Sequence, residues 1–410
     1  MSNFVRRWSV AATITLLIGA AAGTLQRTVA DYCLRHSQTT AETARACRWM
    51  SSNSQCWSTL ARQQAELGQD ARQAWMAALR LNPRSADDAI PAALVAERNR
   101  DLSQAEGLLL STARYSQLSL PRWTLASFYL RHHRLDSFWL WAHRAFERSY
   151  GDRTALFRLC RSAGGTTERM IGNVLPEDPR LRAEYLHFLL VEGSWEELEP
   201  TALACLQAAR TDALANRTVV EAVDALVQSR HPEPAARLWN RLSAEKRIPY
   251  PPLNGEITIV NPDFAQPLEF AGFDWRARAT EGIKVRWGTP PESLKFELSG
   301  EQPDNAGVLE QAIWLLADQR FRFVCQYRIR TLAEGATGLT WVLRDHRSGE
   351  VLSASADLAA VDEWREATVL AKEQSAPRLL LIELQSRRPT GRARLEAEVW
   401  LRRPRIEVLR

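Results

Sequence analysis

The 410-residue sequence lacks the short motifs that mark common enzyme classes. It contains no Gly-x-Ser-x-Gly, His-Glu-x-x-His, Walker loop or Gly-x-Gly-x-x-Gly. Its six cysteines form no Cys-x-x-Cys pair, which argues against a thioredoxin-like site or a zinc ribbon. A mean hydropathy of -0.30 excludes a protein that crosses the membrane many times. We therefore expect no reaction, no cofactor and no metal.

Lysine is also scarce, because only four of the 53 basic residues are Lys and the rest are Arg. We interpret this excess of Arg over Lys mainly as an effect of codon composition. The basic residues are interleaved with 48 acids and gather on no single face, so we expect no nucleic-acid partner. Hydrophobic residues at 45% and charged residues at 25% are typical of a folded protein. At about 150 residues per domain, the length predicts two or three domains.

The N-terminus contains one uncharged run, Trp8 to Gln26, of 19 residues. As a helix it would span about 28 Å, close to the ~30 Å hydrocarbon core of a membrane. Arg6 and Arg7 precede it, so the positive-inside rule keeps the N-terminal tail in the cytoplasm and exports the rest. Residues 1–30 are then either a retained signal anchor, which the length of the run favours, or a signal peptide cleaved near residues 20–22 or 28–30.

An exported chain can form disulfides. Cys47 and Cys56 are the expected pair, bridging a short polar loop. Cys160, Cys205 and Cys325 lie in apolar patterns and are expected to be small buried residues.

From Trp57 to Arg247 the apolar residues recur three and four apart, which predicts helices, and residues 31–247 are predicted to form one helical domain. Sets of three residues, spaced four and then three apart, also recur with a period near 34; the first residue is small in three of them, and Phe138 and Leu198 are large there. The sets are Ala71-Trp75-Ala78, Ala105-Leu109-Thr112, Phe138-Ala142-Ala145, Leu198-Ala202-Cys205 and Ala235-Trp239-Leu242. This pattern resembles tetratricopeptide repeats, with a break around Gly164 and Pro176. The resemblance implies a helical solenoid whose groove binds a protein partner.

Residues 248–254 contain three prolines and are predicted to be a linker. Beyond them, apolar residues recur at every second position. About ten short strands over residues 255–410 predict an antiparallel β-sandwich.

The order of Asn261, Phe264, Gly272-Phe273 and Gln311 resembles jelly-roll carbohydrate-binding modules. That resemblance implies glycan binding, although Ala265 replaces the acid that helps such modules hold calcium. Together with the anchor and the repeats, it resembles proteins of bacterial exopolysaccharide assembly loci. The expected location is therefore the bacterial inner membrane, single-pass, with the body exported.

Alternation along the strands places several polar residues and one tryptophan on outward faces. Trp400 would stack on a sugar, Gln326, Arg328 and Glu398 would bind hydroxyls, and Trp275 would line a rim. The competing interpretation is a solvated face with cross-strand Arg–Glu pairs, each worth only ~0.2–1 kcal/mol.

A hydrolase alternative starts from Glu396 and Glu398, whose carboxylates would lie about 6.5–7 Å apart on one strand face. Acids two apart on strands are common, and no apolar pocket is evident around them. Three functions therefore remain. The predicted one is a non-enzymatic adaptor, and the alternatives are a glycan-processing enzyme and a purely structural scaffold.

Overall fold

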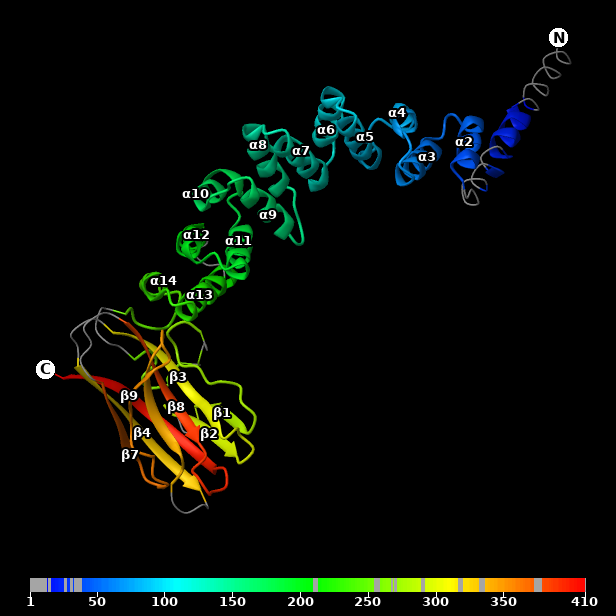
Figure 1. The fold of residues 1–410 in the computed structure, drawn as a ribbon. Coiled ribbons are helices and arrows are strands. Elements are labelled where there is room, and N and C mark those ends of the chain that lie inside the picture. The colour runs from blue at the N-terminus through cyan, green and yellow to red at the C-terminus, as the bar shows by residue number, and fades with distance from the viewer. Residues whose placement is uncertain are drawn as a thin grey trace, which may run out of the picture. The chain divides into compact units, whose positions relative to one another are not determined.

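The computed structural model describes residues 13, 16–25, 28–29, 32, 39–208, 213–253, 259–266, 268, 271–288, 292–315, 320–331, 336–371 and 378–409 (Figure 1). These form two compact units, residues 1–176 and 177–410, which are described separately. Of the predicted anchor segment, residues 1–30, only Thr13 and residues 16–25 and 28–29 are described, and Arg6 and Arg7 lie outside the described residues. Within the described part of the chain, no helix is both long and apolar enough to span a bilayer.

The first unit consists of helices that pack on their neighbours in sequence (Figure 1). They are α2 (Thr40–Trp49), α3 (Ser54–Glu66), α4 (Arg72–Leu81), α5 (Ala86–Arg98), α6 (Leu102–Tyr115), α7 (Ser119–Arg131), α8 (Leu135–Phe146), α9 (Thr154–Ser162), α10 (Thr167–Arg169) and the π-helix η1 (Met170–Val174). Asn53 and Asp101 are N-caps whose side chains accept a backbone N–H of the first turn. Gly68 ends α3 in the left-handed conformation at φ 70°, as glycine allows without strain.

The three periodic sets of this unit lie on α6, on α8, and on α4 with its N-cap Ala71. Every member is at most 1% exposed. The small residues let neighbouring helices approach closely, and the large ones fill the space between them. The predicted helical array with its period near 34 is therefore confirmed in this unit.

The predicted break in the repeat also has a structural counterpart. Where a further second helix would begin, the chain forms only the three-residue α10 followed by η1. His143 on α8 contacts the carbonyl of Val174 through Nδ1 at 3.0 Å, which ties the irregular segment to the preceding hairpin.

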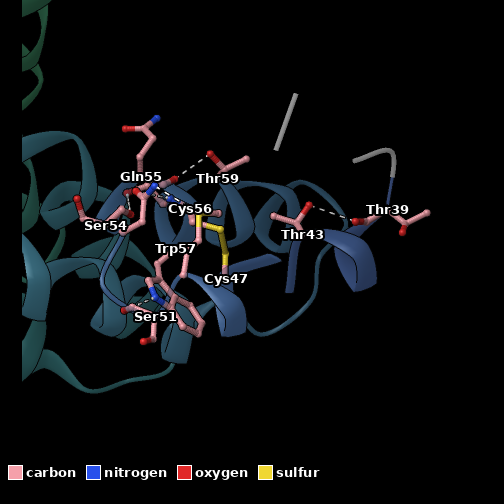
Figure 2. Close-up of a disulfide and its surroundings, with 12 residues drawn as sticks. Thr39, Thr43, Cys47, Ser51, Ser54, Gln55, Cys56, Trp57 and Thr59 are labelled. Carbon is pink, nitrogen blue, oxygen red and sulfur yellow. Dashed lines mark hydrogen bonds between the residues drawn. A yellow bond between two sulfur atoms is a disulfide. The ribbon is translucent and has the colours of Figure 1, made fainter. Parts of the chain in front are cut away.

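A disulfide joins helices α2 and α3 of this unit. Figure 2 shows Cys47 on α2 bonded to Cys56 on α3, the expected pair. Both are fully buried, and Trp57 beside them donates its indole N–H to the carbonyl of Ser51 at 3.2 Å. Cys160, Cys205 and Cys325 are free and buried, as predicted. Burial raises the pKa of Cys160 and of Cys205 to about 12, so both remain thiols at neutral pH.

The second unit begins with four helices, α11 (Pro179–Glu192), α12 (Trp195–Ala208), α13 (Ala213–Gln228) and α14 (Pro232–Ala244). The two remaining periodic sets lie on α12 and α14, and all six residues are fully buried.

The strands of this unit are β1 (Ile283–Trp287), β2 (Leu294–Ser299), β3 (Asn305–Leu315), β4 (Arg320–Thr331), β5 (Leu339–Asp345), β6 (Val351–Ala354), β7 (Arg365–Ala371), β8 (Arg378–Arg387) and β9 (Glu396–Leu409). They form a five-stranded sheet, β1-β2-β9-β4-β7, and a four-stranded sheet, β3-β8-β5-β6, with antiparallel pairing throughout. One apolar core contains inward residues of both sheets, among them Phe296, Phe323, Leu343 and Val399. The predicted antiparallel sandwich is confirmed.

The predicted linker, residues 248–254, is packed in the part that the structure describes. Tyr250 is 4% exposed and donates its hydroxyl to Asp274 Oδ2 at 2.9 Å. Ser243 on α14 donates to the carbonyl of Tyr250 at 2.7 Å. Asn240 and Leu253 exchange two hydrogen bonds of 3.1 and 2.6 Å. The segment therefore joins α14 to the sandwich through direct contacts, and the compact units divide after Pro176 instead.

Further contacts fix the sandwich on the last hairpin. Trp239 on α14 stacks on Tyr250, with ring centroids 5.5 Å apart, and meets Phe273 edge-on at 5.8 Å. Gly272 donates its N–H to Asp224 Oδ1 on α13 at 2.9 Å. A Cβ at Gly272 would lie 2.7 Å from the Trp239 ring, so only glycine fits there. The sandwich thus covers the hairpin face that a further repeat would otherwise cover.

Candidate functional site

Four of the predicted glycan-binding residues lie together on the outer face of the five-stranded sheet, formed by β4 and β9. Arg328 is directly opposite Trp400, and Gln326 is opposite Arg402. Glu398 lies two residues before Trp400 on the same side of β9. Strand alternation therefore identified this group of neighbours correctly.

The aromatic surface of this outer face is covered by cations. The Arg328 guanidinium lies 4.2 Å from the Trp400 ring centroid, and Lys295 and Arg330 lie 5.3 and 5.5 Å from it. Trp400 is consequently only 5% exposed. Each cation is attracted to the ring face and shields it from solvent. The prediction that Trp400 offers a stacking surface for sugar is wrong, because long basic side chains on the two flanking strands fold over it.

A second tryptophan belongs to the same stack and was missed in the sequence. The ring centroid of Trp364, just before β7, lies 3.9 Å from the Arg402 guanidinium and 5.6 Å from that of Arg328. It is part-exposed, in contrast to Trp400. Trp364 follows no strand alternation because it lies in a loop, so only the fold brings it to this face.

The polar groups of the outer face pair with one another. Gln326 accepts a hydrogen bond from Arg402 Nε at 2.9 Å. Glu398 pairs with Lys295 and lies 3.8 Å from Arg330. The hydrogen bond to Glu398 is the main cause that raises the pKa of Lys295. The face is thus a network of cation–π contacts and ion pairs, as the competing interpretation of a paired surface expects.

Trp275 is not at a rim. It is fully buried in the sandwich core, where it lies 5.7 Å from Phe264 and 6.2 Å from Trp341, measured between ring centroids. The prediction that it contacts a ligand is wrong. Nearness to a loop in the sequence does not show how deeply a side chain is buried. Here the loop folds inward, and its aromatic residues complete the core.

The two carboxylates of the hydrolase alternative lie in unsuitable surroundings. Glu396 is exposed at the start of β9. Glu398 lies beside Lys295 and Arg330, whereas the general acid of a glycosidase needs an apolar environment that keeps it protonated. The geometry therefore gives no support to hydrolysis at this pair.

A cavity of about 430 Å³ lies elsewhere in the second unit, between α13 and the four-stranded sheet. Its polar lining comes from Gln228 on α13, Arg276 and Arg278 before β1, Glu310 on β3 and His346 after β5. Val227, Ala312 and Leu381 provide apolar walls. These residues come from five separate stretches of sequence, which is why no motif marks them.

The charges around this cavity are paired. Arg276 forms an ion pair with Asp224, to which Gln228 Nε2 also donates at 3.0 Å. Arg278 donates to Glu310 Oε2 from Nη2 at 2.6 Å and from Nε at 3.0 Å. Burial lowers the pKa of His346, and the positive charges of Arg276 and Arg230 lower it further. The His346 Nδ1 is buried and has no hydrogen-bond partner among the described residues.

Among the residues that the structure describes, no group of three or more His, Cys, Asp or Glu side chains is arranged to hold a metal ion.

No protein-family model and no curated protein matches this sequence. Among solved structures, "CBM4 structure and function" is 11% identical at a TM-score of 0.29, covering 37% of this chain and 99% of its own. YrrB, "a TPR protein with an unusual peptide-binding site", is 12% identical at a TM-score of 0.26, covering 51% and 94%. Pseudomonas aeruginosa PilF is 16% identical at 0.25, covering 55% and 89%. Likeness at these TM-scores is too low to transfer fold or function.

Proposed function

We propose that this chain is a non-enzymatic adaptor of the bacterial envelope. Its helical hairpins bind a protein partner, and its β-sandwich, taken to be a jelly roll, binds glycan. A role in exopolysaccharide assembly or export fits this combination.

The observation that carries the proposal is the docking of the sandwich on α13 and α14. Trp239, a repeat core residue, packs against Tyr250 and Phe273, and Asp224 holds Gly272 and Arg276. A repeat hairpin and a sandwich that share a buried interface move together. A protein partner bound to α13 and α14 is then held at a fixed distance from the ligand of the sandwich. Holding two ligands in this way is the function of an adaptor.

The predicted location rests on the N-terminal run and on the disulfide. Residues 8–26 are uncharged and follow Arg6 and Arg7, which favours a retained single-pass anchor with the body exported. The buried disulfide between Cys47 and Cys56 fits the oxidising conditions outside the cytoplasm.

A glycan array probed with the full-length chain in detergent tests glycan binding. The sequence alone predicts Gln326, Arg328 and Glu398 as contacts, and Arg328→Ala tests that prediction against the alternative of a paired, structural outer face. Binding of any glycan by the wild-type chain supports the proposal, whereas no binding at millimolar oligosaccharide would leave the structural-scaffold alternative. Shortening of a bound oligosaccharide by the wild-type chain, absent in Glu398→Gln, would instead establish the hydrolase.

A further inference from the structure

The cavity between α13 and the four-stranded sheet has the size of a ligand site. Its volume of about 430 Å³ falls within the ~300–1,000 Å³ typical of small-molecule pockets. It lies on the opposite sheet from Trp400, at the junction where Asp224 of α13 binds Gly272 and Arg276. The position places it between a helix of the repeat and the sandwich, where pockets commonly occur.

The lining offers both donors and acceptors. Arg276 and Arg278 are donors only, whereas Glu310 is an acceptor only and the Gln228 amide is both. The part-exposed imidazole of His346 adds a further polar side chain to the lining. Sugar hydroxyls both donate and accept, so this mixture of groups suits them.

The charge of the lining favours a neutral ligand. Arg276 is paired with Asp224 and Arg278 with Glu310, so neither guanidinium is left without a counter-charge. A carboxylate or phosphate would have to displace one of these pairs or lie beside Glu310. A neutral ring with hydroxyl groups on its rim and C–H groups against Val227, Ala312 and Leu381 meets both the polar and the apolar walls.

We propose that this cavity binds a neutral sugar ring of the glycan, and that the outer face with Trp400 is structural. This inference rests on the proposed function, because it assigns the glycan site of the sandwich.

The test is a titration of the full-length chain with methyl glycosides of glucose, galactose, mannose and N-acetylglucosamine, followed by saturation-transfer NMR. The methyl glycoside of glucuronic acid is the anionic comparison. Gln228→Ala and Gln326→Ala remove the same amide group from the cavity and from the outer face, and so form a matched pair. His346→Ala is a second cavity variant, and circular dichroism checks the fold of all three.

We expect a neutral glycoside to bind and Gln228→Ala and His346→Ala to weaken it about five-fold each, the effect of one hydrogen bond. Gln326→Ala should leave the affinity unchanged. Loss of affinity in Gln326→Ala alone, or binding of the glucuronide alone, would overturn the cavity proposal while glycan binding by the sandwich stands. No binding of any glycoside, together with an empty glycan array, would overturn both.

Discussion

At the scale of single residues, the tryptophans of the sandwich differ in what they contribute. Trp400 is covered by Arg328 and is 5% exposed, whereas Trp287 at the end of β1 is 44% exposed. Both lie in the same sheet, so sequence pattern alone does not separate them. Trp287 ends the edge strand β1, whereas Trp400 lies on the central β9, where Lys295 of β2 and Arg328 of β4 cover its ring.

Trp400→Ala should therefore lower the free energy of unfolding by about 3–5 kcal/mol, the range for removing a buried aromatic side chain. Trp287→Ala is the control and should cost about 1 kcal/mol, because its ring is half exposed and loses mainly one hydrogen bond, to the carbonyl of Phe264. Urea unfolding of the two variants measures both losses. Equal losses would contradict the account of the outer face as a packed, structural surface.

Gly272 is a second residue whose effect is large for its size. Its φ is 63°, and an added Cβ would lie 2.7 Å from the Trp239 ring. Gly272→Ala should destabilise the second unit by about 2–4 kcal/mol, from overpacking and backbone strain together. Gly391→Ala is the matched control, because Gly391 has φ 76° but open space around it and should lose only about 1 kcal/mol. Thermal unfolding that fails to separate the two variants would refute the tight docking of the sandwich on α14.

At the scale of elements, the sequence predicts helices and strands well where one periodic face is buried. All five periodic sets are buried, because repeat packing depends on local spacing. Phe323, Cys325 and Ile329 of β4 face the core for the same reason. The burial of Trp275 and the grouping of the cavity residues could not be predicted from the sequence. How deeply a loop is buried, and which distant segments are in contact, depend on the whole fold.

Neighbouring hairpins of the first unit are also joined by polar contacts. Glu97 at the end of α5 accepts from Arg131 at 2.9 and 2.7 Å and contacts His132 Nε2 at 2.9 Å. The hydrogen bond from Arg131 is the largest cause that lowers the pKa of Glu97. A lowered pKa in the folded state means that the stabilisation is present above the unfolded pKa and is lost as pH falls through the folded one.

Glu97→Gln should therefore destabilise the first unit by about 1 kcal/mol at pH 7, and by progressively less below pH 4.5. Glu66→Gln, at the exposed end of α3, serves as the control and should have no effect at either pH. Denaturation midpoints at several pH values check this. A loss from Glu97→Gln that stays constant into acid would show that the ion pair is not its cause.

At the scale of the whole molecule, repeat proteins are stabilised locally, each hairpin by its neighbours. Reduction of the disulfide between Cys47 and Cys56 should loosen α2 and α3, with a loss of about 2–4 kcal/mol for a short loop. Hydrogen exchange with and without a phosphine reductant measures this, and α11–α14 provide the internal control. Faster exchange throughout α11–α14 would contradict the local role of the disulfide.

The central claim is that the sandwich binds glycan and leaves it intact. Native mass spectrometry of the full-length chain, released from detergent and mixed with the strongest oligosaccharide from the array, tests both parts at once. We expect a complex whose mass equals the chain plus the unmodified oligosaccharide and which is stable over hours of incubation. A shortened oligosaccharide, bound or free, would contradict it, and so would the absence of any complex.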